Sequence, residues 1–172
     1  MGSLLRLSTA VVGHRRIWAR RQGEFRLPNG QHAATAMMDW VLLDERGRIL
    51  RIPPDFGIVF PNVELADEIR RVPLGPTPSD AHRLDLRVRP QDLDPMGHVN
   101  NAAYLDWIEE VVAMAGDPEA PARLPRSAAI EYAASAEPDD ELSGAAWRDG
   151  ESWAVRLWRP ADGIDVVRAR LA

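Results

Sequence analysis

Alternation of hydrophobic and polar residues marks one strand of this chain clearly. In the segment HRLDLRVR, residues 82–89, Leu84, Leu86 and Val88 fall on one side, while Asp85 and the arginines fall on the other. Side chains of a β-strand alternate between its two faces, so the segment predicts a strand with one buried face.

After residue 100, the spacing of the hydrophobic residues changes from every second position to the spacing of a helix. Apolar residues recur at helical spacing over about four turns, and Gly116 follows as a stop. The residues concerned are Tyr104, Trp107, Ile108, Val111, Val112 and Ala115. A meander of four strands is predicted after the helix, at 126–135, 140–148, 151–159 and 164–171. We expect the sheet to cover the apolar stripe of the helix, because no other large partner is available.

The first part of the chain reads as strands alone, at 4–12, 15–27 and 31–43, with a turn at 44–48. Turns are also predicted at three Asx-Gly pairs, where both central positions are expected to need a positive φ. These pairs are Asn29-Gly30, Asp149-Gly150 and Asp162-Gly163.

Proline marks the connection between the two halves. Residues 53–80 contain six prolines, which favours a linker, and a short helix is expected around 63–71. A Trp-Ala pair in a strand, followed by an Asx-Gly turn and another strand, occurs at both Trp18 and Trp153. This similarity indicates an internal duplication.

Composition narrows the class of protein. A chain of 172 residues with 45% hydrophobic and 27% charged residues suits a globular protein with one complete domain and part of another. The net charge of −5 argues against nucleic-acid binding. Neither a transmembrane span nor a signal peptide is indicated, so we expect a cytoplasmic protein without a membrane partner.

The residue types present also limit the chemistry. The chain has no cysteine, which excludes disulfides, a thiolate nucleophile and cysteine metal ligands. No His/Asp spacing indicates a metal, and no glycine-rich loop indicates a nucleotide cofactor. We therefore expect neither a metal nor a cofactor.

Polar residues gather just before the predicted helix, in DLDPMGHVNN at 92–101. The first N–H groups of a helix are unpaired and lie at the positive end of its dipole, so we expect those of Gly97, His98 and Val99 to stabilise a carbonyl oxygen. Gly97 has no side chain and lets a carbonyl approach the backbone. Asp94 is expected to orient or deprotonate a water, or to attack directly, and His98 to polarise the carbonyl or position the water.

A structural interpretation stays open for the same residues. Asp92 is expected to be structural, and Asp94 is alternatively a turn residue and a partner of the helix dipole. Asn100 and Asn101 alternatively cap the helix. A single histidine near a helix start, as His98 is, also occurs as a surface residue or a packing residue.

The segment DLDPMGHVNNAAYLDWIEE resembles the helix-entry signature of hot-dog thioesterases. In particular, it resembles the catalytic C-terminal half of the acyl-ACP thioesterases, which carry two hot-dog modules in tandem. ATAMMDWVLLDERGRILRIPPDF is similar to the end of that family's first module. The resemblance implies an α+β hot-dog fold, in which an antiparallel sheet wraps around a central helix. It also implies a shortened, partial N-terminal module at 1–56, a linker at 57–80 and a complete module at 81–172.

The resemblance implies catalytic roles for Asp94 and His98, which match the family's aspartate and histidine. The family usually has an asparagine where Met96 stands, and often an acidic residue or a cysteine where Ser135 and Ala136 stand. The implied reaction is hydrolysis of fatty acyl-ACP or acyl-CoA to a free fatty acid and the carrier thiol, within fatty acid biosynthesis or lipid metabolism.

Two alternatives to hydrolysis stay open. A catalytically impaired homologue would bind acyl thioesters or a partner without turnover, as the departures at Met96, Ser135 and Ala136 favour. A hot-dog dehydratase or isomerase is the other alternative, and the GHVNN run argues against it. Asn100 and Ser135 are candidate supporting residues, and the expected partner is an acyl carrier protein or a coenzyme A thioester.

The N-terminal strands carry three further candidate features. Four arginines form a predicted basic patch that either holds a pantetheine phosphate or an acidic carrier protein, or is a solvated strand face. They are Arg15, Arg16, Arg20 and Arg21. Met37, Met38 and Trp40 either line an acyl tunnel or pack within the sheet. A strand face without a covering helix predicts a partner chain, with a homo-oligomer as one candidate.

Overall fold

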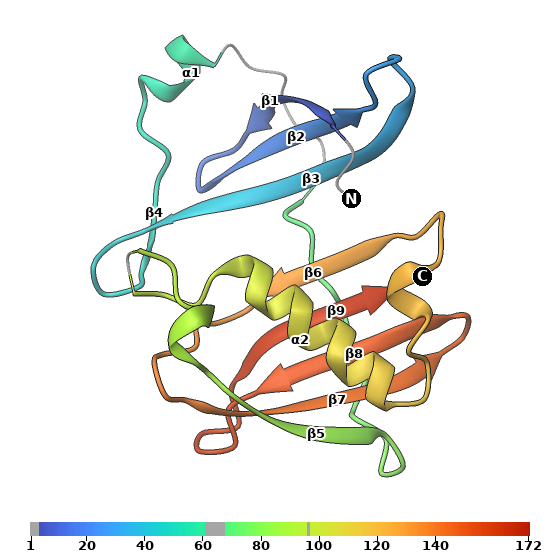
Figure 1. Cartoon of the computed structure of the whole chain (residues 1–172). Helices are drawn as coiled ribbons and strands as arrows, with labels where there is room; N and C mark the ends of the chain where they lie inside the picture. The colour runs from blue at the N-terminus through green and yellow to red at the C-terminus, as the bar shows by residue number, and fades with distance from the viewer. Residues whose placement is uncertain (1–3, 61–67, 96) are drawn as a thin grey trace. The chain divides into compact units, whose positions relative to one another are not determined.

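The computed structural model describes residues 4–60, 68–95 and 97–172, which form two compact units, Met1–Arg70 and Arg71–Ala172 (Figure 1). The boundary at Arg70 falls within the predicted linker, and the module limits at 56 and 81 stay predictions. No helix in the described part of the chain is long and apolar enough to span a membrane.

The C-terminal unit is a five-stranded antiparallel sheet with one long helix packed against it (Figure 1). Its strands are β5 (His82–Arg87), β6 (Ala128–Tyr132), β7 (Glu141–Asp149), β8 (Ser152–Trp158) and β9 (Asp165–Leu171). Its helices are α2 (Asn101–Met114) and two 3-10 turns, Pro90–Asp92 and Ala120–Ala122. This is the α+β hot-dog arrangement that the family resemblance implied.

The predicted meander is correct for β7, β8 and β9 but wrong for β6. The strand order is β5-β7-β8-β9-β6, so β6 pairs with β9, and β5 lies beside β7. The segment from β6 to β7 passes α2, where the Ala136 N–H donates to the Tyr104 hydroxyl at 2.9 Å. Hydrophobic alternation determines which face of a strand is buried, but it does not determine the neighbouring strand.

The apolar stripe of α2 forms the centre of the core. Ile108, Val111 and Val112 are fully buried, and Tyr104 and Trp107 are nearly so. They pack with apolar residues of the surrounding strands: Leu84, Leu86, Val88, Leu142, Val155, Leu157 and Val167. The predicted buried face of β5 and the predicted stripe of α2 are therefore confirmed.

The C-terminal end of α2 is anchored by a buried carboxylate. Gly116, at φ 100°, follows the helix and is followed by Asp117. The carboxylate of Asp117 accepts hydrogen bonds from Arg123, Arg148 and the indole N–H of Trp153. The bonds from Arg123 and Trp153 lower the pKa of Asp117 to about 2. Asp117 thus connects the end of α2 to β7 and β8.

The N-terminal unit is a four-stranded antiparallel sheet in the order β1-β2-β3-β4. Its strands are β1 (Arg6–His14), β2 (Trp18–Arg26), β3 (His32–Leu43) and β4 (Ile49–Leu50). The three predicted strands are confirmed, whereas β4 and the one-turn helix α1 (Phe56–Val59) were not predicted. The helix expected around 63–71 falls mostly on residues 61–67, which lie outside the described residues, and residues 68–71 are not helical.

All three Asx-Gly pairs lie at strand connections, as predicted, but only their glycines have a positive φ. Among the described residues, Asp139 is the one non-glycine residue with a positive φ. At the first pair, the Leu27 N–H donates to the Gln31 carbonyl, closing a three-residue loop in which Gly30 alone is left-handed. The expectation of two left-handed positions was therefore wrong.

The N-terminal sheet buries few side chains. Trp18 and Ala19 are its buried hydrophobic residues among those described. Met37, Met38 and Trp40 are 40%, 42% and 54% exposed, so they are not packed within the sheet as one interpretation expected. Met37 also lies on the opposite face of β3 from Met38 and Trp40, because side chains alternate along a strand. The three side chains therefore do not share one face of β3. The acyl tunnel and the covering partner chain stay predictions.

The tightest contact between α2 and the sheet occurs at Gly144 of β7. A Cβ atom on Gly144 would lie 2.6 Å from Cγ2 of Val111 and 3.1 Å from Cδ2 of Leu157. Both side chains are fully buried and cannot move away without disturbing close-packed neighbours. The absence of a side chain at Gly144 therefore sets how closely the helix approaches the sheet.

We expect Gly144→Ala to reduce the free energy of unfolding by about 1–3 kcal/mol, because the added methyl group overpacks the core. Urea denaturation followed by circular dichroism measures this change. Gly75→Ala is the matched control, because a Cβ there meets no atom within 4 Å. Equal midpoints for the two variants would contradict the importance of this contact.

Candidate active site

The residues predicted to carry chemistry lie in a closed loop directly before α2. Leu93 and Val99 form an antiparallel bridge at its base. Next to the bridge, the Asp94 N–H donates to the His98 carbonyl at 2.7 Å. These contacts close the base of the loop where the chain enters the helix.

Asp94 is the centre of this loop. Its carboxylate accepts the His98 N–H at 3.1 Å, and its carbonyl accepts the Gly97 N–H at 3.0 Å. The side chain is partly buried, not turned fully into solvent. The structure therefore brings Asp94, Gly97 and His98 together, in contact with one another.

The placement of Gly97, His98 and Val99 at the helix N-terminus was wrong. The helix begins at Asn101, and Gly97 at φ 83° belongs to the preceding turn. The N–H groups of Gly97 and His98 are bonded to Asp94, and Val99 is buried in the core at 6% exposure. Donation from these groups to a carbonyl oxygen stays a prediction, and it would require the bonds to Asp94 to open.

The imidazole of His98 is the accessible polar group of the loop. His98 is exposed, and its ring forms no hydrogen bond with any residue that the structure describes. The ring is therefore available for contact with a ligand. Met96, which stands between Asp94 and His98 in the sequence, lies outside the described residues.

Asp92 and Asn100 have structural partners. Asp92 is buried, and its carboxylate accepts the Arg89 N–H at 2.8 Å and the Arg89 guanidinium at 3.1 Å. Burial acts to raise the pKa of Asp92, but the side-chain and main-chain bonds from Arg89 lower it below its usual value. The side chain of Asn100 accepts the Ala102 N–H at 2.9 Å and caps α2. The structural interpretations of Asp92 and Asn100 are thus confirmed.

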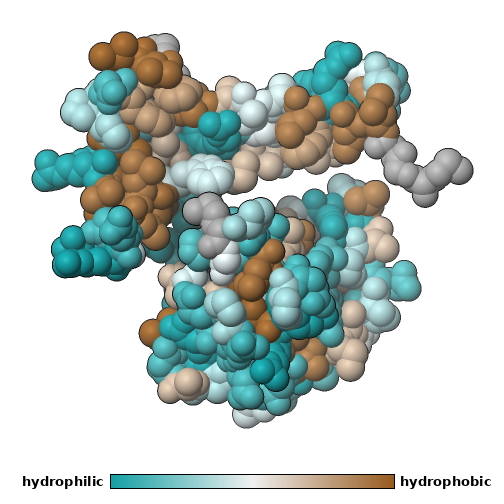
Figure 2. Space-filling view, turned by 60° about the vertical axis from the view of Figure 1, so that its left-hand side comes forward, coloured by the Kyte–Doolittle hydropathy of each residue, from teal (hydrophilic) through white to brown (hydrophobic). Residues whose placement is uncertain are grey.

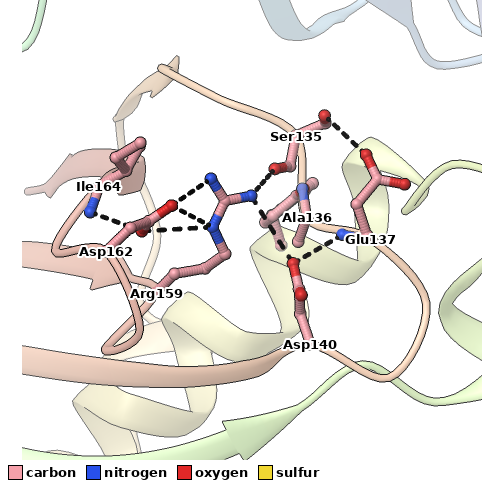
Figure 3. Close-up of polar contacts among 8 residues, drawn as sticks. Ser135, Ala136, Glu137, Asp140, Arg159, Asp162 and Ile164 are labelled. Atoms are coloured by element: carbon pink, nitrogen blue, oxygen red, sulfur yellow. Dashed lines mark hydrogen bonds and ion pairs between the residues drawn. The ribbon is translucent and has the colours of Figure 1, made fainter.

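A second polar group lies on the loop after β6 (Figure 3). Ser135 is exposed, and its hydroxyl donates to the carboxylate of Glu137 at 3.4 Å. The Glu137 N–H donates to Asp140 at 2.8 Å, and Arg159 donates to the Ser135 carbonyl at 3.1 Å. These contacts hold Ser135 and Glu137 close to each other.

The loop after β6 lies against the N-terminal half of α2. The Tyr132 hydroxyl donates to the Asn101 carbonyl at 3.2 Å, and the Ala136 N–H donates to the Tyr104 hydroxyl one helical turn further on. Ala136 and Val99 also belong to the same buried cluster. The loop holding Asp94 and the loop holding Ser135 therefore lie at the same end of α2.

Glu137 was not identified from the sequence. An acidic residue two positions after a serine in an irregular segment has no distinctive signature. Its contact with Ser135 depends on how the loop bends between β6 and β7.

Comparison with known proteins relates this part of the chain to a protein family. Residues 76–155 match the model of the acyl-ACP thioesterase C-terminal domain. The match includes the Asp94 loop, all of α2 and the Ser135 loop. These residues, just under half of the chain, resemble the C-terminal domain of that family. The predicted family resemblance is thereby confirmed.

One curated relative of the chain is the chloroplastic oleoyl-acyl carrier protein thioesterase 2 of Arabidopsis thaliana. It is 26% identical over 118 residues, which cover 61% of this chain and 31% of the relative. The chain therefore matches about a third of the relative's length.

Solved structures confirm the hot-dog fold over nearly the whole chain. The 12:0-ACP thioesterase from Umbellularia californica has a TM-score of 0.76 at 24% identity, covering 97% of this chain and 66% of that one. An acyl-ACP thioesterase from Bacteroides thetaiotaomicron has a TM-score of 0.75 at 17% identity, covering 97% of this chain and 67% of that one.

We expect Gly97→Ala to destabilise the Asp94 loop, because a side chain at φ 83° costs about 1–2 kcal/mol. A Cβ at Gly97 meets no atom within 4 Å, so the effect comes from the backbone alone. Gly97→Asn is the comparison, because asparagine tolerates this conformation better. Hydrogen exchange at the His98 amide should be accelerated more by alanine than by asparagine. Equal exchange in wild type and both variants would show that the loop does not need this turn.

Proposed function

We propose that the protein hydrolyses fatty acyl thioesters, acyl-ACP or acyl-CoA, to a free fatty acid and the carrier thiol. The observation that supports this most is the closed loop holding Asp94 and His98 at the entrance to α2, inside residues that match a thioesterase domain. This loop combines a carboxylate, an accessible imidazole and the positive end of a helix, which thioester hydrolysis can use together.

Asp94 is the proposed base. A carboxylate has about four acceptor positions, so Asp94 can accept a hydrogen bond from a water molecule as well as from the His98 N–H. Asp94 orients the water and accepts its proton while the oxygen attacks the thioester carbonyl. The carbon–sulfur bond then breaks, and the departing thiolate takes a proton. Direct attack by Asp94, through an anhydride, is the other route open to the same carboxylate.

The proposed stabilisation of the carbonyl oxygen comes from His98 and the end of α2. The imidazole is exposed and free of bonds to described residues, so it can donate to the oxygen. The dipole of α2 adds positive potential at Asn101, where the helix begins. The N–H groups of Gly97 and His98 contribute only if a substrate displaces Asp94 from them.

Ser135 and Glu137 are proposed to support the attacking water. The resemblance places an acidic residue or a cysteine where Ser135 and Ala136 stand, and Ala136 is buried without a polar side chain. Glu137 provides a carboxylate next to the Ser135 hydroxyl at the same end of α2 as Asp94. Ser135 and Glu137 can thus together bind the attacking water in place of the acidic residue or cysteine that the family often has.

Binding without turnover is the second candidate function. Two observations favour it. The acidic residue or cysteine that the family often has is absent at Ser135 and Ala136, and Asp94 forms bonds within its own loop. On this interpretation the Asp94 loop is only a structural turn. The protein then binds an acyl thioester without hydrolysing it, or binds a partner.

We expect purified protein to release thiol from a chain-length series of acyl-CoA and acyl-ACP substrates, measured with a thiol reagent. Asp94→Asn should reduce kcat by at least about 100-fold, because it removes the base. His98→Ala should reduce kcat by about 100-fold through loss of carbonyl polarisation. Glu137→Gln should lower kcat less and leave KM nearly unchanged.

Asp139→Asn is the control for these variants. Asp139 is an exposed carboxylate two residues after Glu137, and asparagine tolerates its positive φ of 66°. It should keep wild-type turnover. Undiminished release by Asp94→Asn would remove the proposed mechanism, and acyl-thioester binding without any release by wild type would favour the second candidate.

A further inference from the structure

The N-terminal unit has an open groove of about 560 Å³ near the turn between β1 and β2. Its lining residues are Arg15, Arg16, Ile17, Trp18, Ile49 and Arg51. The turn is closed by a hydrogen bond from the Arg15 N–H to the Trp18 carbonyl at 2.8 Å. The Ile52 N–H donates to the Arg16 carbonyl at 2.9 Å, which brings the segment containing Arg51 to the same place.

The groove differs from the basic patch predicted from the sequence. Arg20 is 2% exposed and forms a buried ion pair with Asp39 at 2.6 Å, so it is not available to a ligand. Arg21 lies on the next strand position and donates to Thr9 at 3.5 Å, away from the groove lining. The prediction is therefore wrong for Arg20, and Arg21 does not line the groove. Arg51, which the sequence did not group with the others, takes their place.

The three guanidinium groups of the groove have no carboxylate partner among the residues that the structure describes. Arg15, Arg16 and Arg51 are exposed and form no ion pair or side-chain hydrogen bond with any residue in the described ranges. Most other arginines of the chain are paired, including Arg156 and Arg170 on the C-terminal sheet. Unpaired arginines gathered in one groove create a local positive potential.

The charge of the chain is also divided unevenly along the sequence. Residues 1–70 contain ten arginines against eight acidic residues, a formal charge of +2. Residues 71–172 contain eleven arginines against eighteen acidic residues, a formal charge of −7. An anion is therefore attracted to the N-terminal unit although the whole chain is negative.

Apolar side chains lie beside the three arginines. Ile17 is 39% exposed and Ile49 is 54% exposed, while Trp18 is buried beneath them at 4%. Figure 2 shows brown, hydrophobic surface next to teal, hydrophilic surface on the N-terminal unit. The groove thus offers a place for a strongly anionic group and, next to it, for a chain without charge.

We propose that this groove binds a phosphate ester carried on a short uncharged chain, and that the ligand is the phosphopantetheine of a thioester carrier. Planar guanidinium groups bind phosphate oxygens with paired hydrogen bonds, and three of them provide enough donors for the oxygens of one phosphate ester. The exposed isoleucines contact the chain that follows. The choice of pantetheine as the source of the phosphate rests on the proposed function, whereas binding in the groove does not require turnover.

The test is titration calorimetry of the full-length protein with 4′-phosphopantetheine and with pantetheine, which differ only in the phosphate. Wild type should bind the phosphorylated compound at least about tenfold more tightly, and high salt should weaken that binding. The triple variant Arg15→Gln, Arg16→Gln, Arg51→Gln should lose this tenfold preference.

A second triple variant controls for the loss of net charge. Arg6→Gln, Arg21→Gln and Arg46→Gln remove the same number of charges from exposed or partly buried positions of the same unit outside the groove. This variant should keep most of the preference for the phosphorylated compound. Circular dichroism spectra matching wild type for both variants exclude misfolding as the cause of a loss.

Several outcomes would overturn the proposal. Equal weakening by the two triple variants would show a diffuse charge effect, and equal affinity of wild type for both compounds would show that phosphate is not recognised. Sedimentation of wild type with phosphatidylglycerol vesicles, without binding of phosphopantetheine, would assign the groove to a lipid surface instead. Phosphopantetheine binding without thiol release from acyl thioesters would leave this inference standing and reject only the proposed hydrolysis.

Discussion

The burial of α2 against the five-stranded sheet is the interaction on which the rest of the C-terminal unit depends. The apolar stripe of the helix fills the concave face of the sheet, and Gly144 lets the two approach within van der Waals contact. Because the helix is fixed, its first turn is fixed, and the loops that touch this turn are positioned with it. The Asp94 loop enters the helix directly, and the Ser135 loop is bonded to Tyr104 on its next turn. The candidate chemistry is thus a consequence of core packing.

The parts of the fold that periodicity determines were predicted well from the sequence. The two-residue period of β5 and the helical period of α2 each follow from one buried face, which is a local property of the chain. The neighbour of β6 was not predictable in the same way, because it depends on a connection passing α2. The helix start at the two asparagines was predicted correctly, because Asn100 is a typical helix cap. The bonds from the Gly97 and His98 N–H groups to Asp94 were not predicted, because they depend on how the turn before the helix folds.

The candidate site shows the same division between local and long-range information. The grouping of Asp94, Gly97 and His98 was visible because these residues are close in sequence. The contact between Ser135 and Glu137, and the addition of Arg51 to Arg15 and Arg16, depend on segments brought together by folding. An alternating run of arginines also cannot reveal that one of them, Arg20, is neutralised by a buried carboxylate on the neighbouring strand.

The central claim is that Asp94 and His98 face the reacting carbonyl of an acyl thioester. It is tested most directly by a crystal structure of the protein with an acyl-CoA analogue in which a methylene group replaces the thioester sulfur. We predict that the carbonyl oxygen lies within hydrogen-bond distance of the His98 imidazole, with a water molecule on the carboxylate of Asp94. A carbonyl bound away from the start of α2, with the Asp94 loop unchanged and no water on its carboxylate, would contradict the account.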